Sequence, residues 1–246
     1  MSFHFSPKIV TNGLVLYLDA ANPKSYPGSG TTWYDLSGNN INLTLSNASY
    51  DTSNYGRMIF SSASNAYASV NNSLLNLYSS GSLEVICNID NWGSTDFWHI
   101  GSKGASAGFD NDGYALWFYG TVAQSASNNI YASCANRDWI PSGSHHQAAI
   151  IGNYSLIGNN ISQFAMTWNP TSVSGYYNGN LRNTTTFSAR NPVGPNVAGL
   201  NFVISRIDSL ARYTDQNVFI VRVYNRALTQ SEIKQNFTTV NPRFAL

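Results

Sequence analysis

Charged residues are scarce in this sequence. Asp, Glu, Lys and Arg make up only 10% of its 246 residues, and the formal net charge at neutral pH is +1. No Lys/Arg-rich run is present, which argues against nucleic-acid binding because that function needs a basic surface. No segment is apolar and long enough to cross a bilayer, so we expect no membrane insertion. The first residues lack the basic and apolar regions of a signal peptide, so we expect no export by that route.

Glutamate is rarer still. Glu84 and Glu232 are the only two in the chain, whereas glycoside hydrolases generally place a pair of carboxylates around the scissile bond. Glu84 stands among apolar residues with no acidic residue two positions further on, and the aspartates show no such strand pattern either. We therefore expect a non-enzymatic protein, and a glycoside hydrolase is kept as a minor alternative.

The chain has only two cysteines. Cys87 lies on the apolar face of a strand-like run and is predicted to be a small buried residue. Cys134 is predicted to lie in a polar loop. A disulfide between them stays open, although such bonds are typical of exported proteins.

The four histidines do not suggest a metal site. His145 and His146 are adjacent, so in an extended segment their side chains would face opposite ways. His4 and His99 have no Cys, Asp or Glu at ligand spacing, and we expect both to be solvated loop residues.

Short apolar runs alternate with Asn, Gly, Ser and Pro along the whole chain, which is typical of a β-sandwich. The clearest period-two segments are 83–89, 161–168 and 218–224, each predicted to be a strand with one buried side. Weaker strand candidates are 14–18, 41–45, 57–60, 97–100, 114–119, 147–151, 173–178 and 201–206. Together these strands suffice for two packed sheets.

Two local motifs are specific. The Asn-Gly pair at 178–179 predicts a tight hairpin with positive φ angles. Thr229 and Glu232 fit a capping box, and Ile233 and Phe237 would then point to one side of a short C-terminal helix. The segment 120–146 matches neither period, and we expect an irregular excursion over a sheet face there.

Three stretches resemble a known family. The opening 9–38 contains IVTNGLVLYLDAAN and resembles the start of concanavalin A-like/laminin G-like domains in tailed-phage structural proteins and bacterial surface proteins. The stretch 221–233, VRVYNRALTQSEI, is similar to the family's closing strand and helix, and FAMTW at 164–168 with YNG at 177–179 looks like its central strand and hairpin. Where many relatives have Ile-Gly-Arg, this chain has Ile-Ser-Arg at 204–206.

The resemblance implies an all-β fold, a two-sheet antiparallel jelly-roll sandwich with a short C-terminal helix and with both termini in one sheet. We expect one such domain over 9–240, an N-terminal arm over 1–8 and a C-terminal tail over 241–246. No coiled-coil segment dictates an oligomeric state, and a homo-oligomer stays open.

Two pairs of aspartates could form either a metal site or local turns. Asp110 and Asp112 place hard oxygen donors on alternate residues of a loop, which suits calcium, although turn chemistry explains the same residues. Asp19 and Asp35 lie in the opening motif and are predicted to form Asx-type turns.

Aromatic rings near loops or strand ends could stack on a sugar or anchor a protein partner. These residues are Trp92, Trp98, Trp117, Tyr119, Tyr131 and Trp139. Tyr131 and Trp139, beside Arg137 and Asp138, are the foremost candidates because they fall in the segment 120–146.

The resemblance to phage proteins favours one biological setting. We expect a component of a bacteriophage virion surface, a capsid decoration or tail-appendage protein, made in the host cytoplasm. Its partners would be other capsid or tail proteins, with a surface glycan as a further possibility. The alternative is a carbohydrate-binding lectin or adhesin module at a cell surface or in the extracellular space.

Overall fold

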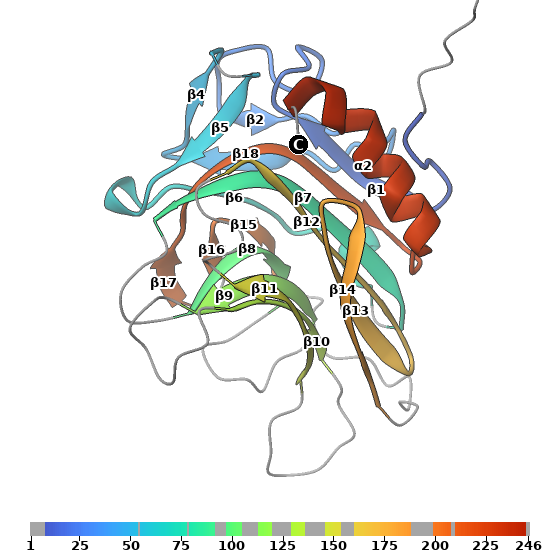
Figure 1. The fold of residues 1–246 in the computed structure, drawn as a ribbon. Helices are drawn as coiled ribbons and strands as arrows, with labels where there is room; N and C mark the ends of the chain where they lie inside the picture. Colours follow the sequence, from blue (N-terminus) through green and yellow to red (C-terminus); the bar gives the residue numbers. More distant parts are fainter. Residues whose placement is uncertain are drawn as a thin grey trace, which may run out of the picture.

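The computed structural model describes residues 8–53, 55–77, 79–91, 97–104, 113–119, 129–135, 146–153, 160–187, 199–207 and 210–244. Two antiparallel sheets face each other across a common core (Figure 1). Sheet A has the order β14-β13-β12-β7-β18-β5-β4, with β1 paired to β18, and sheet B has the order β11-β10-β9-β8-β15-β6-β3-β2. The fold is thus the predicted two-sheet jelly roll.

The strand bounds follow the apolar alternation of the sequence. Sheet A contains β1 (Leu14–Asp19), β4 (Ser49–Asp51), β5 (Arg57–Phe60), β7 (Gly81–Asn91), β12 (Ser162–Asn169), β13 (Ser172–Tyr177), β14 (Asn180–Thr186) and β18 (Asp215–Tyr224). Sheet B contains β2 (Thr32–Trp33), β3 (Leu43–Ser46), β6 (Tyr67–Val70), β8 (Phe97–Lys103), β9 (Tyr114–Tyr119), β10 (Asn129–Ala135), β11 (His146–Asn153) and β15 (Phe202–Ile204). Strands β16 (Arg206–Ile207) and β17 (Leu210–Tyr213) form a separate pair, and short 3-10 turns span Ser62–Ser64 and Ser73–Leu75.

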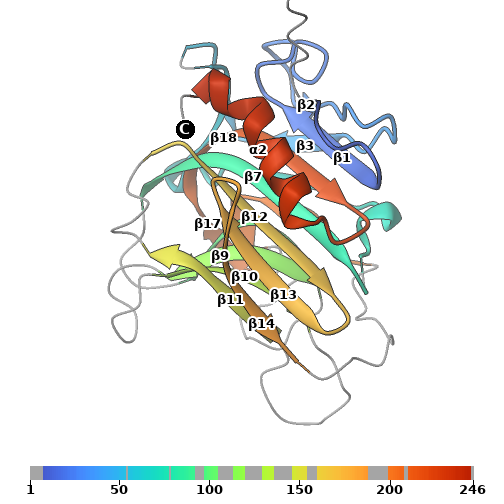
Figure 2. The ribbon, with the colours of Figure 1, turned by 45° about the vertical axis from the view of Figure 1, so that its right-hand side comes forward.

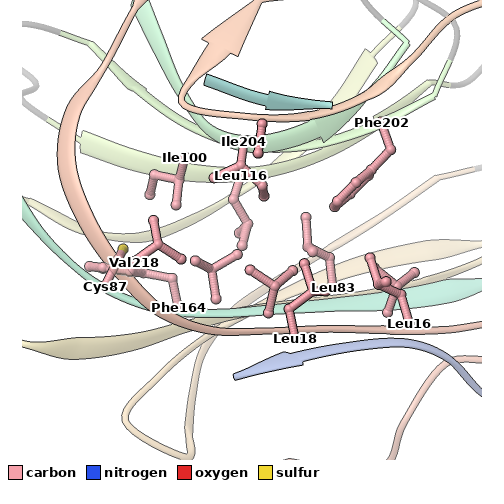
Figure 3. Close-up of a cluster of buried hydrophobic side chains, with 14 of the residues drawn as sticks. Leu16, Leu18, Leu83, Cys87, Ile100, Leu116, Phe164, Phe202, Ile204 and Val218 are labelled. Carbon is pink, nitrogen blue, oxygen red and sulfur yellow. The ribbon is translucent and has the colours of Figure 1, made fainter. Parts of the chain in front are cut away.

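Side chains on the facing sides of the two sheets form the main core. Leu83 and Phe164 from sheet A meet Ile100, Leu116 and Ile204 from sheet B, and all of them are fully buried (Figure 3). Because successive side chains of a strand point to opposite sides, the residues between these core positions lie on the outer faces of the sheets.

The structure corrects the expectation for 120–146. Strand β10 lies within that segment and pairs with β9 on one side and β11 on the other. Ile130, Ala132 and Cys134 of β10 point into the core, so Cys134 is buried and not in a polar loop. Cys134 and Cys87 are both buried, and no disulfide joins them. The alternation of apolar and polar residues in β10 is weak in the sequence, because alanine and serine occupy 132, 133 and 135 and are weak strand formers.

The predicted turn and chain-end geometry is confirmed. Asn178 and Gly179 have φ angles of 46° and 74° and connect β13 to β14. β1 pairs with β18, which joins the two ends of the domain in one sheet as the resemblance implies. The position where relatives have glycine also has a structural reason, since Ser205 adopts a left-handed φ of 65°.

The C-terminal helix α2 (Gln230–Phe244) is longer than expected. The capping box is confirmed: the Thr229 N–H donates to Glu232 Oε2 at 2.8 Å, and the Glu232 N–H donates to Thr229 Oγ1 at 3.3 Å. Ile233 and Phe237 are buried as predicted, but the helix continues through the expected tail as far as Phe244, which packs on Phe219. Among the described residues, no helix is long and apolar enough to span a membrane.

The two views show α2 lying across the outer face of sheet A, with β8, β9, β10 and β11 on the opposite side of the sandwich (Figures 1 and 2). Lys8 and Val10 are hydrogen-bonded to this helix. The carbonyl of Lys8 accepts from Gln235 Nε2, and the N–H of Val10 donates to Asn236 Oδ1. The outer face of sheet A is therefore a packed structural face.

Candidate ligand-binding site

One of the aromatic residues singled out in the sequence lies on the outer face of sheet B. Tyr131 projects outward from β10, because its neighbours Ile130 and Ala132 are in the core. It stacks on Trp117 of β9, with ring centroids 4.5 Å apart and an interplanar angle of 15°. Strand register places these two residues directly opposite each other. We call the pair the aromatic platform.

Hydrogen bonds hold the aromatic platform in place. The indole N–H of Trp117 donates to Ser133 Oγ at 2.8 Å, and Asn129 Nδ2 donates to the Tyr131 hydroxyl at 3.4 Å. Trp117 is buried, whereas Tyr131 is half-buried. Trp117 and Ser133 thus serve to orient Tyr131, and Tyr131 is the ring that can meet a ligand.

His99 lies beside the platform, opposite Trp117 in the neighbouring strand β8. It is buried, which corrects the expectation of a solvated loop residue. Burial and, to a smaller extent, the positive charge of Arg212 lower the pKa of His99 to about 3. Its Nδ1 lies 2.9 Å from Ser102 Oγ. An imidazole with so low a pKa is a weak base at neutral pH, so this pair is unsuited to activating the serine as a nucleophile.

Glu84, one of the two glutamates of the chain, lies far from the platform. It is on the outer face of sheet A, beneath α2. It is fully buried and accepts hydrogen bonds from Arg222 Nη1 at 3.3 Å, Asn236 Nδ2 at 3.0 Å and Gln163 Nε2 at 3.3 Å. Burial raises the pKa of Glu84, and the charge of Arg222 acts in the opposite direction. These hydrogen bonds show that Glu84 belongs to the interface between α2 and sheet A.

The other described carboxylates also have structural partners. Asp19 and Asp35 form the predicted Asx turns by accepting from the N–H groups of Ala21 and Ser37. The remaining contacts join Asp19 to Arg243, Asp51 to Arg57, Asp90 to Asn217, Asp215 to Ser62 and Glu232 to Arg226. In the part of the chain that the structure describes, carboxylates therefore serve the fold.

Of the other sequence candidates, Trp98 packs against the main core and Tyr119 ends β9. The remaining ones lie outside the described residues: Trp92, Arg137, Asp138 and Trp139 of the binding candidates, and Asp110 and Asp112 of the calcium candidate. Within the described ranges no group of three or more His, Cys, Asp or Glu residues could hold a metal ion. The calcium site stays a prediction.

A family model described as the concanavalin A-like lectin/glucanases superfamily, of laminin G type, matches residues 61–234. The chain belongs to this superfamily. That result confirms the family and the fold class inferred from the sequence. A search of curated proteins found no match.

Solved structures with a similar fold include binding domains of toxins. The binding domain of botulinum neurotoxin DC in complex with rat synaptotagmin II has a TM-score of 0.69 at 14% identity, covering 94% of this chain and 52% of that one. A structure of botulinum neurotoxin type C, whose cell entry is described as dependent on interaction with two ganglioside molecules, has a TM-score of 0.66 at 15% identity, covering 94% and 52%. For the binding domain of Paraclostridial Mosquitocidal Protein 1 the values are 0.65, 15%, 92% and 52%. This chain thus spans about half the length of these neighbours.

Proposed function

We propose that this chain is a non-enzymatic binding module that holds a glycan on the outer face of sheet B. The observation that carries the proposal is the aromatic platform, in which Tyr131 is held flat against a buried Trp117. A pyranose ring presents an apolar face that can pack on such a ring. The hydroxyl of Tyr131 can add a polar contact at the edge of the ring.

Two further observations support binding over catalysis. Every described carboxylate has a partner that serves the fold, and the imidazole of His99 has a pKa of about 3. The structural neighbours include a neurotoxin binding domain in complex with synaptotagmin II and a neurotoxin whose cell entry depends on ganglioside molecules. A protein partner at the same face is the main competing proposal, because aromatic anchors serve both kinds of ligand.

The test is a glycan microarray of neutral and acidic glycans, followed by affinity electrophoresis on the best ligand. We expect Tyr131→Ala to lower the affinity about fivefold, since loss of one aromatic contact is worth about 1 kcal/mol. Tyr131→Phe should retain most of the binding. Tyr34→Ala is the matched control, because Tyr34 is 43% exposed and follows β2 at the opposite edge of sheet B.

Two outcomes would reject glycan binding at this site. One is the absence of any bound glycan on the array. The other is a Tyr131→Ala variant that binds as tightly as the wild-type protein.

The setting on a bacteriophage virion surface is part of the proposal and rests on the phage-like opening motif at 9–38. Mass spectrometry of purified virus particles from the source tests it. A copy number near that of the major coat protein would indicate capsid decoration, and a few copies would indicate a tail appendage. Absence from the particles would reject the virion setting and favour a cell-surface lectin or adhesin.

A further inference from the structure

Two asparagine–glycine pairs occur in the chain, Asn12-Gly13 and Asn178-Gly179. Asparagine is a thermolabile residue, because the backbone nitrogen of the next residue can attack its side-chain amide. A following glycine makes this attack easiest, since it has no Cβ to obstruct the approach. The structure gives the two pairs different surroundings, so their reactivity should differ as well.

The reactive groups of Asn178-Gly179 are both held by Gln163. The Gln163 N–H donates to Asn178 Oδ1 at 2.8 Å, and the Gly179 N–H donates to Gln163 Oε1 at 2.8 Å. Gln163 is fully buried, and Gly179 is buried against Lys234 and Phe237 of α2. Attack of the Gly179 nitrogen on the Asn178 side chain therefore requires both hydrogen bonds to open first.

The corresponding groups of Asn12-Gly13 have no such protection. Asn12 is exposed, and in the described part of the chain no hydrogen bond reaches its side chain or the Gly13 N–H. The pair occupies the centre of a turn in which the Leu14 N–H donates to the Thr11 carbonyl at 3.1 Å. The φ of 79° at Gly13 is typical of the third position of a type II turn, which favours glycine. The hydrogen bonds of this turn thus leave the two reacting groups without a competing partner.

We propose that Asn12 is a deamidation site, at which the protein slowly converts to aspartate and isoaspartate forms. A base removes the proton of the Gly13 N–H, and the nitrogen forms a bond to Cγ of Asn12. The bond between Cγ and Nδ2 breaks, and the leaving nitrogen takes up a proton and departs as ammonia. Water then opens either carbonyl of the resulting succinimide ring. Water is the only co-reactant, and nothing is oxidised or reduced.

The site lies where the two ends of the domain meet. The Asn12 carbonyl accepts from Arg226 Nε at 3.0 Å, and the Gly13 carbonyl accepts from the Asn225 N–H at 2.9 Å. Arg226 is in turn paired with Glu232 of α2 at 2.6 Å. An isoaspartate inserts an extra methylene group into the main chain, so these two contacts cannot both keep their geometry. Isoaspartate formation should therefore loosen the junction of β1 with β18, whereas an aspartate only adds an exposed charge.

The experiment follows both pairs in the full chain during incubation in a warm, mildly alkaline buffer. Peptide mapping by mass spectrometry, with fragmentation that separates aspartate from isoaspartate, measures the two rates. The same measurement in urea gives the rates of both pairs without structural protection. The variants are Asn12→Gln, Asn12→Asp and Gln163→Met, of which the last removes the amide that protects Asn178.

In the native protein we expect Asn12 to convert at least about tenfold faster than Asn178, the effect of two hydrogen bonds of average strength. In urea the two rates should become similar, since both asparagines precede glycine. Gln163→Met should accelerate the reaction at Asn178 and leave that at Asn12 unchanged. The comparison of native and urea-treated wild type does not depend on how this variant folds.

Thermal unfolding measures the structural consequence. The incubated wild-type protein should lose thermal stability as isoaspartate accumulates. Asn12→Asp should melt close to wild type, because it carries the charge without the longer main chain. Asn12→Gln should keep its melting temperature during the incubation, because the longer side chain cyclises far more slowly.

Either of two results would overturn the deamidation site. One is conversion of Asn178 in the native protein as fast as that of Asn12. The other is an Asn12 that stays intact for the time in which the urea-treated chain converts fully. Unchanged thermal stability of a protein rich in isoaspartate at this position would overturn the proposed effect on the junction of β1 with β18.

Discussion

The outer faces of the two sheets differ in what their polar side chains do. On sheet A, α2 covers a buried network in which Glu84 accepts from Arg222, Asn236 and Gln163. On sheet B, the described residues include a half-buried Tyr131 and a half-buried Arg206, each supported by aromatic rings. The same alternation of side chains produces both faces. One face directs its polar groups to a helix of the same chain, and the other carries the aromatic platform that we propose binds a glycan.

This difference explains how a chain with few charges can have a stable scaffold and a binding surface together. Two ion pairs stabilise the ends of the chain: Arg243 of α2 binds Asp19 of β1 at 2.8 Å, and Arg226 binds Glu232 of α2 at 2.6 Å. We therefore expect substitutions on the sheet A face to change stability and leave ligand binding intact, and substitutions on the sheet B face to do the reverse.

The largest effect is expected at the buried ion pair. Glu84→Ala should lower the free energy of unfolding by about 3–5 kcal/mol, because it leaves the buried Arg222 without its counter-ion. The double variant Glu84→Leu/Arg222→Met should recover most of this loss, since it removes both charges and fills the space. Denaturant unfolding measures both. Arg57→Met is the control, because its pair with Asp51 is partly exposed to solvent and its loss should change the free energy of unfolding far less.

Phe244→Ala tests the far end of α2. Phe244 is buried against Phe219, with ring centroids 5.1 Å apart. Removing a buried phenylalanine typically costs about 3 kcal/mol, and a helix terminus can relax enough to reduce that figure somewhat. A loss below about 0.5 kcal/mol in equilibrium unfolding would be far smaller than a core truncation produces, and would show that residues 241–246 form a loose tail after all.

A smaller, pH-dependent effect is expected at the helix cap. Hydrogen bonds from Arg226 lower the pKa of Glu232 from 4.5 to about 2. Since the folded-state pKa is depressed, this stabilisation is present above pH 4.5 and is lost as the pH falls toward 2. Glu232→Gln should cost about 1 kcal/mol at pH 7, and its difference from wild type should shrink below pH 4.5. Unfolding free energies measured from pH 7 downward test this, and a constant difference would contradict it.

The smallest effect on stability is expected at Ser205. Ser205→Gly relieves the left-handed backbone but removes the hydroxyl that accepts from Gln216, two effects of about 1 kcal/mol each that oppose one another. Thermal unfolding should therefore change little, whereas Ser205→Val should be clearly destabilised because a β-branched side chain tolerates positive φ poorly. A melting temperature for Ser205→Val equal to that of wild type would contradict this account of the turn.

Local sequence signals predicted much of the fold. The alternation at 83–89 and 218–224, the Asn-Gly turn and the capping box each depend on neighbours in sequence, and the structure confirms them. Strand β10 was not predicted because Ala132, Ser133 and Ala135 give little contrast between its two faces.

The site was harder to predict because its contacts join distant segments. Tyr131 and Trp117 were both named as aromatic candidates, but their stacking depends on the register of β9 and β10. No sequence pattern indicated the aromatic contacts of Arg206. Its contacts with Tyr67 and Tyr213 exist only once β15 lies beside β6 and the backbone turns at Ser205.

The central claim is that ligand binding belongs to the outer face of sheet B and not to the face under α2. Carbene footprinting with mass spectrometry, in the presence and absence of the best glycan from the microarray, tests it most directly. We predict protection of Tyr131 on β10, with α2 and the exposed side of β14 labelled equally in both samples. Protection confined to α2 or β14, with Tyr131 labelled equally in both samples, would contradict the account.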